Sequence, residues 1–345
     1  MKALVFQPGS SDPQTAIGAI FTTDIPLDDK RRRFRKGNRI TLADLADLAR
    51  VEQVLHLTQL DPGDMHEDEA AIALGQAITG PGIDQKPPIQ SRVNLIAARK
   101  GLLRVNREAV VALNRLPGIS VFSLLDRVAV VPGKNVAGAK ITPVAIPAAV
   151  LAEAERIAAE ESVIQVKPFA PKRVAVVTTE GLEEKVRERF RVAVEQKIGW
   201  YGSVVTGITD LIDDPDRVAE AISGEIANGA DLVLTGGGNS LDPLDPTLLA
   251  LDEIDAEMIK FGAPAHPGSM FWLAYKGSTP IFNLASCSLY SRSTVADIIL
   301  PWIMAGERVE LDDMAEIGYG GLLDRDMTFR FPAYDQDTTV EVEDE

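Results

Sequence analysis

The pattern of hydrophobic and polar positions differs between the two halves of the chain. In the second half, short continuous apolar runs alternate with segments of helical periodicity, which is typical of parallel βαβ units. Strands are predicted at 174–179, 202–208, 230–234 and 279–284, and helices at 182–197, 215–228, 248–251 and 293–305. Because the strand runs are apolar without alternation, we expect an α/β fold with a mostly parallel sheet buried on both faces.

The first half mixes helices with short runs of β type, which Gly, Pro and Asn separate. Helices are predicted at 40–50, 66–78, 107–113 and 148–161, strands at 16–22, 54–57, 102–105, 119–122, 128–131 and 141–144, and a linker at 164–172. We therefore expect an amino-terminal α+β, β-rich region at 1–167, with room for two subdomains. An α/β domain at 168–310 and a carboxy-terminal extension at 311–345 with an acidic tail are expected to follow.

Composition narrows the class of protein. A chain of 345 residues with 46% hydrophobic residues is ordinary for a globular protein of two or three domains. The formal charge of −16 argues against a nucleic-acid partner, and the basic run at 30–36 is interpreted as a solvated loop. The single cysteine, Cys287, excludes an intrachain disulfide and a Cys-based zinc site, which favours the cytoplasm. No apolar run approaches the ~20 residues of a membrane span, and no signal-peptide pattern is present.

The most informative feature is a glycine-rich turn that follows the apolar run at 230–234. Residues without a Cβ let the backbone adopt positive φ and bring its N–H groups against a ligand. The candidate binding residues of this turn are Thr235, Gly236, Gly237, Gly238, Asn239 and Ser240. The acids Asp242 and Asp245 follow, and Asp245 precedes Pro246 at a predicted helix start. A strand, a glycine turn and a helix start predict a ligand site at the carboxyl end of the strand, although a merely tight βα turn is the alternative.

A second turn of this kind closes the strand at 174–179. It contains the candidate binding residues Thr178, Thr179 and Glu180, followed by Gly181. Hydroxyl groups and backbone amides before a helix can receive an anion. The turn is weak evidence by itself, and its value is that both turns belong to the same predicted sheet.

Acidic residues near these turns suggest a magnesium site. Asp214 precedes Pro215 and is an ordinary helix cap, whereas Asp213, or else Asp210, can face the ligand. Together with Asp245 it could hold Mg²⁺, which binds few carboxylates and keeps water and phosphate oxygens as further ligands. The ion would let a strongly acidic protein accept a phosphorylated substrate.

Two later loops are weaker candidates, because each can equally be loop filler. They contribute Pro267 and Gly268 before an apolar stretch, and Ser286 after the strand at 279–284. Other kinds of site are not supported by the sequence. The three histidines, His56, His66 and His266, lack the spacing of metal ligands. The glycine turn matches neither the dinucleotide-binding fingerprint nor a Walker loop. Cys287 is interpreted as a packed thiol rather than a nucleophile.

These motifs together resemble the molybdopterin-binding domain of molybdenum cofactor biosynthesis proteins, which includes gephyrin-type molybdenumtransferases and MoaB/Mog-like domains. The matching segments of the second half are 178–181, 213–215, 234–240 with Asp245, and 266–268. The first half resembles a related bacterial group of molybdopterin-binding proteins at 16–24, 34–38, 66–71 and 136–143, and 294–301 and 318–321 fit the same group. The resemblance covers most of the chain.

The resemblance implies a three-layer α/β domain that binds molybdopterin or adenylyl-molybdopterin. It further implies that the glycine turn cradles this ligand, that Asp213 and Asp245 act in catalysis and hold Mg²⁺, and that molybdate is the second substrate. Two departures stand out: Ala285–Cys287 replaces the family's Pro-Gly-Asn-Pro-like turn, and no sizeable β domain follows Pro301. Pterin binding is therefore better supported than molybdenum transfer.

We thus expect a cytoplasmic molybdopterin-binding transferase of molybdenum cofactor biosynthesis that uses Mg²⁺ to insert molybdenum. The alternative is a carrier or chaperone without catalytic activity that hands the cofactor to a molybdoenzyme acceptor. A nucleotide-binding enzyme of unrelated chemistry is a third, weaker alternative. The amino-terminal half carries no recognisable chemistry, so we assign it to dimerisation or partner contact, and no nucleic acid or membrane partner is expected.

Overall fold

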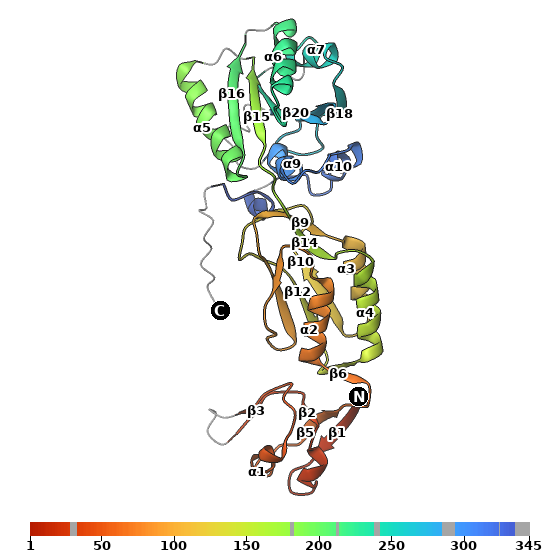
Figure 1. Cartoon of the computed structure of the whole chain (residues 1–345). Coiled ribbons are helices and arrows are strands. Elements are labelled where there is room, and N and C mark those ends of the chain that lie inside the picture. Colours follow the sequence, from red (N-terminus) through yellow and green to blue (C-terminus); the bar gives the residue numbers. More distant parts are fainter. Residues whose placement is uncertain are drawn as a thin grey trace. The chain divides into compact units, whose positions relative to one another are not determined.

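The chain forms two compact units, and each is described by itself. The computed structural model (Figure 1) describes residues 1–27, 33–179, 183–211, 214–237, 242–284, 294–323 and 325–334. The amino-terminal unit consists of Met1–Arg99, Leu103–Asp126 and Pro132–Val166, and the carboxy-terminal unit of Lys100–Leu102, Arg127–Val131 and Lys167–Glu345. Among the described residues, no helix is long and apolar enough to cross a membrane.

The amino-terminal unit is a mixture of small antiparallel sheets and helices. Its strands are β1 (Lys2–Phe6), β2 (Ile20–Phe21), β3 (Ile25–Pro26), β4 (Arg33–Phe34), β5 (Leu55–Gln59), β6 (Asp64–His66), β7 (Ile83–Gln85), β8 (Arg92–Ala97), β10 (Ile119–Ser123), β12 (Asn135–Ile141) and β13 (Ala145–Pro147). Its helices are η1 (Pro13–Ala16), η2 (Leu42–Asp44), α1 (Leu45–Leu48), α2 (Glu67–Ile78), α3 (Arg107–Asn114) and α4 (Ala148–Glu160). The sheets have the orders β1-β5-β2, β10-β12-β8-β7, β13-β6 and β3-β4.

Two segments of the amino-terminal unit that are distant in sequence meet at the start of α2. The ring Nε2 of His66 lies 2.7 Å from the carbonyl oxygen of Gly37, and Nδ1 accepts the N–H of Asp68. Gly37 has a φ of 84°, and the carboxylate of Glu67 occupies the place that a Cβ on Gly37 would take. Segments 34–38 and 66–71 are therefore in contact. Position 37 favours glycine because its φ is positive and Glu67 fills the space beside it.

The carboxy-terminal unit is an α/β domain built on one six-stranded sheet. Its strands are β11 (Ala129–Val130), β15 (Arg173–Thr178), β16 (Val204–Asp210), β17 (Leu232–Gly236), β18 (Glu257–Phe261), β19 (Trp272–Lys276) and β20 (Thr279–Leu284). Its helices are α5 (Glu184–Trp200), α6 (Pro215–Ala227), α7 (Pro246–Glu253), α9 (Val295–Met304), α10 (Leu311–Glu316) and η3 (Arg325–Arg330). The six-stranded sheet has the order β16-β15-β17-β20-β19-β18.

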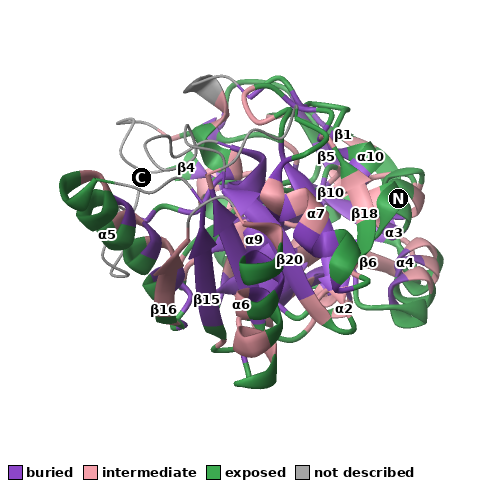
Figure 2. Cartoon of the chain, turned by 90° about the horizontal axis from the view of Figure 1, so that it is seen from above, coloured by how far each residue is buried: buried purple, intermediate pink, exposed green. Residues whose placement is uncertain are grey.

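The sheet of this domain is covered on both faces. β16, β15, β17 and β20 are parallel, and β19 and β18 are antiparallel to their neighbours. Alternate strand residues point to opposite faces, so Val174 and Val176 pack with α5 and α9, whereas Ala175 and Val177 pack with α6 and α7. Figure 2 shows β15 and β20 buried, with exposed residues along α5 and α6. The predicted three-layer α/β fold, with helices on both faces of a mostly parallel sheet, is confirmed.

Several local predictions differ from the structure. Residues 164–168 form β14 (Ile164–Pro168) in the sheet β11-β9-β14, with β9 at Gly101–Val105, and are not a linker. The strand predicted at 141–144 lies earlier, as β12, because the run 135–141 pairs with β8 and β10. The predicted helix at 40–50 is a 3₁₀ turn followed by the single-turn α1. β18, β19 and α10 were not predicted, because their polar and apolar residues follow no clear period.

Candidate functional site

The carboxyl ends of β15 and β17 form the topological switch point of the sheet, which we call the crevice. These strands are parallel neighbours, with Val177 opposite Thr235 and Thr178 opposite Gly236. After β15 the chain enters α5 and continues to β16, whereas after β17 it enters α7 on the opposite face and continues to the other side of the sheet. Ligands of open α/β sheets bind where neighbouring connections diverge in this way. Both sequence-predicted turns begin at this point.

The last residue of β15 is tied to the last residue of β16. Thr178 is buried, and its Oγ1 donates a hydrogen bond of 2.7 Å to Oδ1 of Asp210. Nη2 of Arg187, in the first turn of α5, donates to Oδ2 of the same carboxylate at 2.7 Å. Asp210 therefore connects a strand end to a helix start, and Arg187 is a residue of the candidate site that the sequence did not predict.

Thr179 follows Thr178 at the mouth of the crevice. Its backbone N–H donates to the carbonyl oxygen of Gly236 at 3.1 Å, which continues the ladder between β15 and β17. The side chain is 5% exposed, and its Oγ1 has no hydrogen-bond partner among the described residues. A buried hydroxyl without a partner is costly in a finished structure, so it is a natural place for a ligand atom. Glu180 lies outside the described residues.

The glycine turn begins against the β15 side of the crevice. A Cβ on Gly236 would lie 3.1 Å from Cγ2 of Thr178 and 3.2 Å from the ring of Phe190, so a side chain would crowd both neighbours. Gly237 has a φ of 87°, a conformation that favours glycine. Thr235 is buried in the sheet. The other predicted residues of this turn, Gly238, Asn239 and Ser240, lie outside the described residues.

Of the two acids predicted to hold Mg²⁺, the structure describes Asp245 and not Asp213. Asp245 is buried and caps α7, because its Oδ1 accepts the N–H groups of Thr247 at 2.9 Å and Leu248 at 3.3 Å. Asp213 lies outside the described residues. Asp214 caps α6 through the N–H of Arg217, as predicted from the following proline. In the described part of the chain, no group of three or more His, Cys, Asp or Glu side chains could hold a metal ion.

The segment with Pro267 and Gly268 lies at the same edge of the sheet. The Asn283 side chain, near the end of β20, accepts the N–H of Trp272 at 2.8 Å and donates to the carbonyl oxygen of Met270 at 3.0 Å. The His266–Pro267 peptide bond is cis. Gly268 has a φ of 117°, and a Cβ there would lie 2.9 Å from the Val295 side chain at the start of α9. Ser286 and Cys287 lie outside the described residues.

The string 318–321 joins the same segment. The N–H of His266 donates to the carbonyl oxygen of Gly321, and the N–H of Leu323 donates to that of His266, both at 2.8 Å. A Cβ on Gly321 would collide with the carbonyl oxygen of Pro264. Two motifs that are about 50 residues apart in sequence are thus adjacent, and the close approach explains a glycine at 321.

A buried polar cluster holds the start of α9. Asp297 is 1% exposed; its Oδ2 accepts the N–H and hydroxyl of Thr294, and its Oδ1 accepts Nζ of Lys197 at 2.7 Å and the Tyr334 hydroxyl at 3.0 Å. Burial raises the pKa of Tyr334, and of Tyr201 beside it, well above the usual value, so both phenols remain protonated. We call Asp297, Lys197, Thr294 and Tyr334 the α9 cluster. Its only sequence signal was the capping-box spacing of Thr294 and Asp297.

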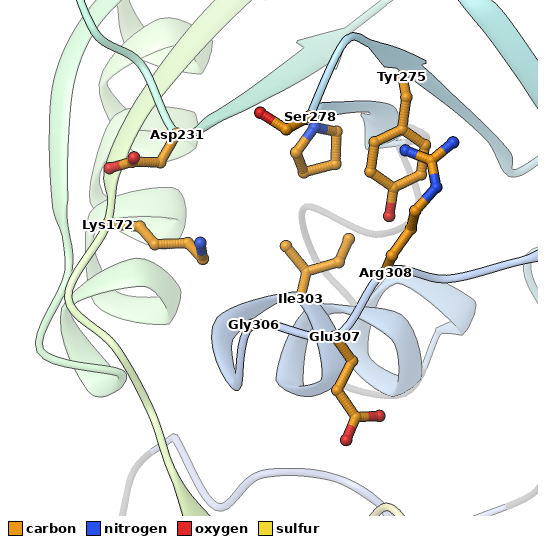
Figure 3. A pocket seen from close by; sticks show the side chains of 9 residues that line it. Lys172, Asp231, Tyr275, Ser278, Ile303, Gly306, Glu307 and Arg308 are labelled. Carbon is orange, nitrogen blue, oxygen red and sulfur yellow. The ribbon is translucent and has the colours of Figure 1, made fainter.

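A separate cavity of about 230 Å³ lies at the opposite, amino-terminal edge of the sheet. Lys172 precedes β15, Asp231 precedes β17, and Ile303 belongs to the last turn of α9 (Figure 3). Nearby charges are paired with each other: Glu307 with Lys167 and Arg127, and Arg308 with Glu257 and Glu310. None of the sequence-predicted site residues that the structure describes lines this cavity. Because the divergent connections lie at the carboxyl edge, we place the candidate site at that edge.

Comparison with known proteins identifies the domain that carries the crevice. Residues 173–305 match a family model described as "Probable molybdopterin binding domain". The predicted resemblance to the molybdopterin-binding family is therefore confirmed for this segment, which supports a role in molybdenum cofactor biosynthesis. No curated protein matches the chain.

Solved structures of similar proteins cover different shares of the chain. A molybdopterin biosynthesis protein from Mycobacterium abscessus is 20% identical over 34% of this chain and 85% of that chain, with a TM-score of 0.29. The molybdopterin biosynthesis enzyme MoaB from Thermus thermophilus is 18% identical over 39% and 98%, with a TM-score of 0.29. A molybdopterin biosynthesis MoeA protein from Pyrococcus horikoshii is 17% identical over 74% and 81%, with a TM-score of 0.30.

Proposed function

We propose that this chain, whose residues 173–305 belong to the molybdopterin-binding domain family, binds molybdopterin or adenylyl-molybdopterin and inserts molybdenum into it with the help of Mg²⁺. The observation that carries the proposal is the crevice between the carboxyl ends of β15 and β17. There, Thr178 lies opposite Gly236, where the glycine turn starts, and Thr179 follows Thr178. The buried Oγ1 of Thr179, which bonds to none of the described residues, is the atom that a bound ligand would satisfy.

The chain's own groups suit a phosphorylated ligand. The backbone of Gly237 is in the conformation that lets a glycine turn approach an anion, and the start of α5 faces the same crevice. Thr179 can donate its hydroxyl hydrogen to a phosphate oxygen. The remaining glycine-turn residues, Gly238, Asn239 and Ser240, with Glu180, Pro267, Gly268 and Ser286, complete the proposed binding set.

The proposed metal site uses Asp213 and Asp245. Both hydrogen bonds that Asp245 makes in the described part of the chain use Oδ1, so Oδ2 is the oxygen proposed to face the ion. Two carboxylates fit Mg²⁺, which completes its shell with water and phosphate oxygens. When bound, Mg²⁺ would supply positive charge beside the phosphate oxygens. Asp245 itself would hold the ion while keeping the start of α7 in place.

The test separates the charge of Asp245 from its capping role. Asn caps a helix about as well as Asp, so Asp245→Asn should stay folded while losing the charge that a cation needs. We expect Asp245→Asn and Asp213→Ala to lose molybdenum insertion, measured as cofactor formed from molybdopterin substrate, molybdate and Mg²⁺. Asp252→Ala, which removes an exposed acid from α7, is the matched control and should keep activity. Full activity in both site variants would exclude this mechanism.

A carrier that delivers finished cofactor to a molybdoenzyme is the second candidate function. The observation that favours it is Ala285–Cys287, which replaces the family's Pro-Gly-Asn-Pro-like turn. A turnover assay with excess molybdate distinguishes the two functions. A transferase forms many equivalents of product, whereas a carrier binds one equivalent of pterin and forms none. The amino-terminal unit is proposed to provide dimer or acceptor contacts, which size measurement of the full chain tests.

A further inference from the structure

We infer that Arg187 is the residue that recognises the ligand's phosphate, and that Asp210 holds Arg187 in position for it. The inference rests on the proposed function and adds a residue and a specificity to it: the site would select a phosphorylated pterin over one that lacks the phosphate. Three observations support it: the charge around the crevice, the contacts of Arg187, and a comparison with its neighbour Arg191.

The crevice needs a positive group of its own. The chain carries a formal charge of −16, and acids stand at the ends of the strands or the starts of the helices that border the crevice. Asp210 ends β16, Asp214 caps α6 and Asp245 caps α7. A phosphate that approached these carboxylates would be repelled unless a cation stood nearby. The proposed Mg²⁺ offsets Asp213 and Asp245, but Asp210 lies on the α5 side of the site.

Arg187 supplies that cation. It is the fourth residue of α5, and its Nη2 lies 2.7 Å from Oδ2 of Asp210, while the other oxygen of Asp210 accepts the Thr178 hydroxyl at 2.7 Å. The Asp210 side chain is only 11% exposed, but the Arg187 side chain is 49% exposed. The carboxylate is thus fixed on both oxygens and acts as a rigid anchor beside Thr178. A guanidinium has five N–H donors in one plane, so it can hold an anchor and bind phosphate oxygens together.

Arg191, one turn further along α5, shows what an arginine without this role looks like. Its side chain is 45% exposed, close to the value for Arg187. Arg191 pairs within the helix, with Glu188 at 2.7 Å and Glu195 at 2.8 Å. Glu188 and Glu195 lie at the i−3 and i+4 positions, which are the usual surface partners on a helix. Arg187 instead reaches across to a strand end, toward the crevice.

The test compares two ligands and four variants of the full chain. The ligands are molybdopterin and molybdopterin from which the phosphate has been removed enzymatically, and binding is measured anaerobically by equilibrium dialysis. Losing hydrogen bonds from a charged group should weaken binding of the phosphorylated ligand about 10- to 100-fold in Arg187→Ala. Arg187→Lys should lose less, because it keeps the charge but not the planar fork. Arg191→Ala is the matched control and should bind as the wild type does.

The decisive outcome is the difference between the ligands. We expect the dephosphorylated ligand to bind the wild type and Arg187→Ala with the same, weaker affinity, and raised salt to reduce the wild type's preference for the phosphate. Asp210→Asn, which keeps an acceptor for Thr178 but removes the charge that anchors Arg187, should reduce the same preference. Equal losses with both ligands, or no loss in Arg187→Ala, would overturn the inference and leave the proposed function standing. A wild type that binds neither ligand would overturn both.

Discussion

The two edges of the six-stranded sheet carry polar residues of different kinds. At the carboxyl edge they are mainly short side chains: Thr178 at the end of β15 bonds Asp210, which also pairs with Arg187, Asp245 caps α7, and Asn283 ties β20 to Met270 and Trp272. At the amino edge they are long charged side chains: around the cavity in Figure 3, Arg308 pairs with Glu257 and Glu307 pairs with Lys167.

This difference has a physical origin. Parallel strands end next to the starts of the following helices, so the carboxyl edge gathers N–H groups that favour anions and short capping acceptors. Most polar groups there are fixed by hydrogen bonds to the ends of strands and helices. Thr179 is left with a buried hydroxyl that no described residue bonds. At the amino edge, Arg308 pairs with two largely exposed carboxylates, and an exposed ion pair contributes little, whereas the Glu307 carboxylate is nearly buried. Mutations should therefore have large effects at the carboxyl edge and small effects at the exposed pairs of the amino edge.

The largest effect is expected for Asp297 in the α9 cluster. Asp297→Ala would leave Lys197 without the partner that lies 2.7 Å away, and would remove the acceptor of Tyr334 and the cap of α9. Removing one member of a buried ion pair costs about 3–5 kcal/mol, because the other charge stays buried. We expect a loss of this size in the free energy of unfolding, measured by urea denaturation.

Asp44 offers a matched control for that substitution. It makes the same two capping bonds, from the Thr41 N–H at 2.8 Å and the Thr41 hydroxyl at 2.6 Å, but the side chains are not buried. Asp44→Ala removes only a cap, so it should cost about 0.5–2 kcal/mol. Equal effects for Asp44→Ala and Asp297→Ala would contradict the view that burial makes the α9 cluster important.

The same contrast explains which features the sequence could predict. Local signals were sufficient to predict the alternation of strands and helices and the helix caps at Asp214 and Asp245. An Asp-Pro pair marks a helix start by itself, because the Asp side chain bonds N–H groups only two or three residues later. The glycine turn and the Thr178–Thr179 turn could be proposed as site elements because the residues of each turn are continuous in sequence. Both lie at strand ends, where the topology then brought them together.

Features that depend on distant contacts could not be predicted. Arg187 and Asp210 are 23 residues apart and meet only when α5 lies beside β16, and Lys197 and Asp297 are 100 residues apart. β18 was missed because it is an edge strand with a shift in register against β19, so its side chains do not alternate cleanly. In each case the missing information is the spatial order of the elements.

A smaller effect is expected where the string 318–321 joins the carboxyl edge. Gly321→Ala would place a Cβ against the carbonyl oxygen of Pro264, so the backbone of one segment must move. Overpacking of this kind costs about 1–3 kcal/mol. The shift should also strain the two hydrogen bonds to His266, which thermal unfolding together with hydrogen exchange of the His266 and Leu323 amides would detect. Gly207→Ala, where a Cβ would meet no atom within 4 Å and φ is not positive, controls for the introduction of a Cβ without a collision.

The smallest effect is expected at the amino edge, for Arg308. Its guanidinium lies 2.6 Å from Glu257 and 2.9 Å from Glu310, and 4.0 Å from the centre of the Tyr275 ring. The two carboxylates are largely exposed, so the ion pairs are screened, and Arg308→Ala should lower the free energy of unfolding by less than about 1 kcal/mol. The variant should bind molybdopterin as the wild type does, because the proposed site residues that the structure describes lie at the other edge. Weakened pterin binding in Arg308→Ala would place the ligand at the cavity in Figure 3 and reverse the assignment of the two edges.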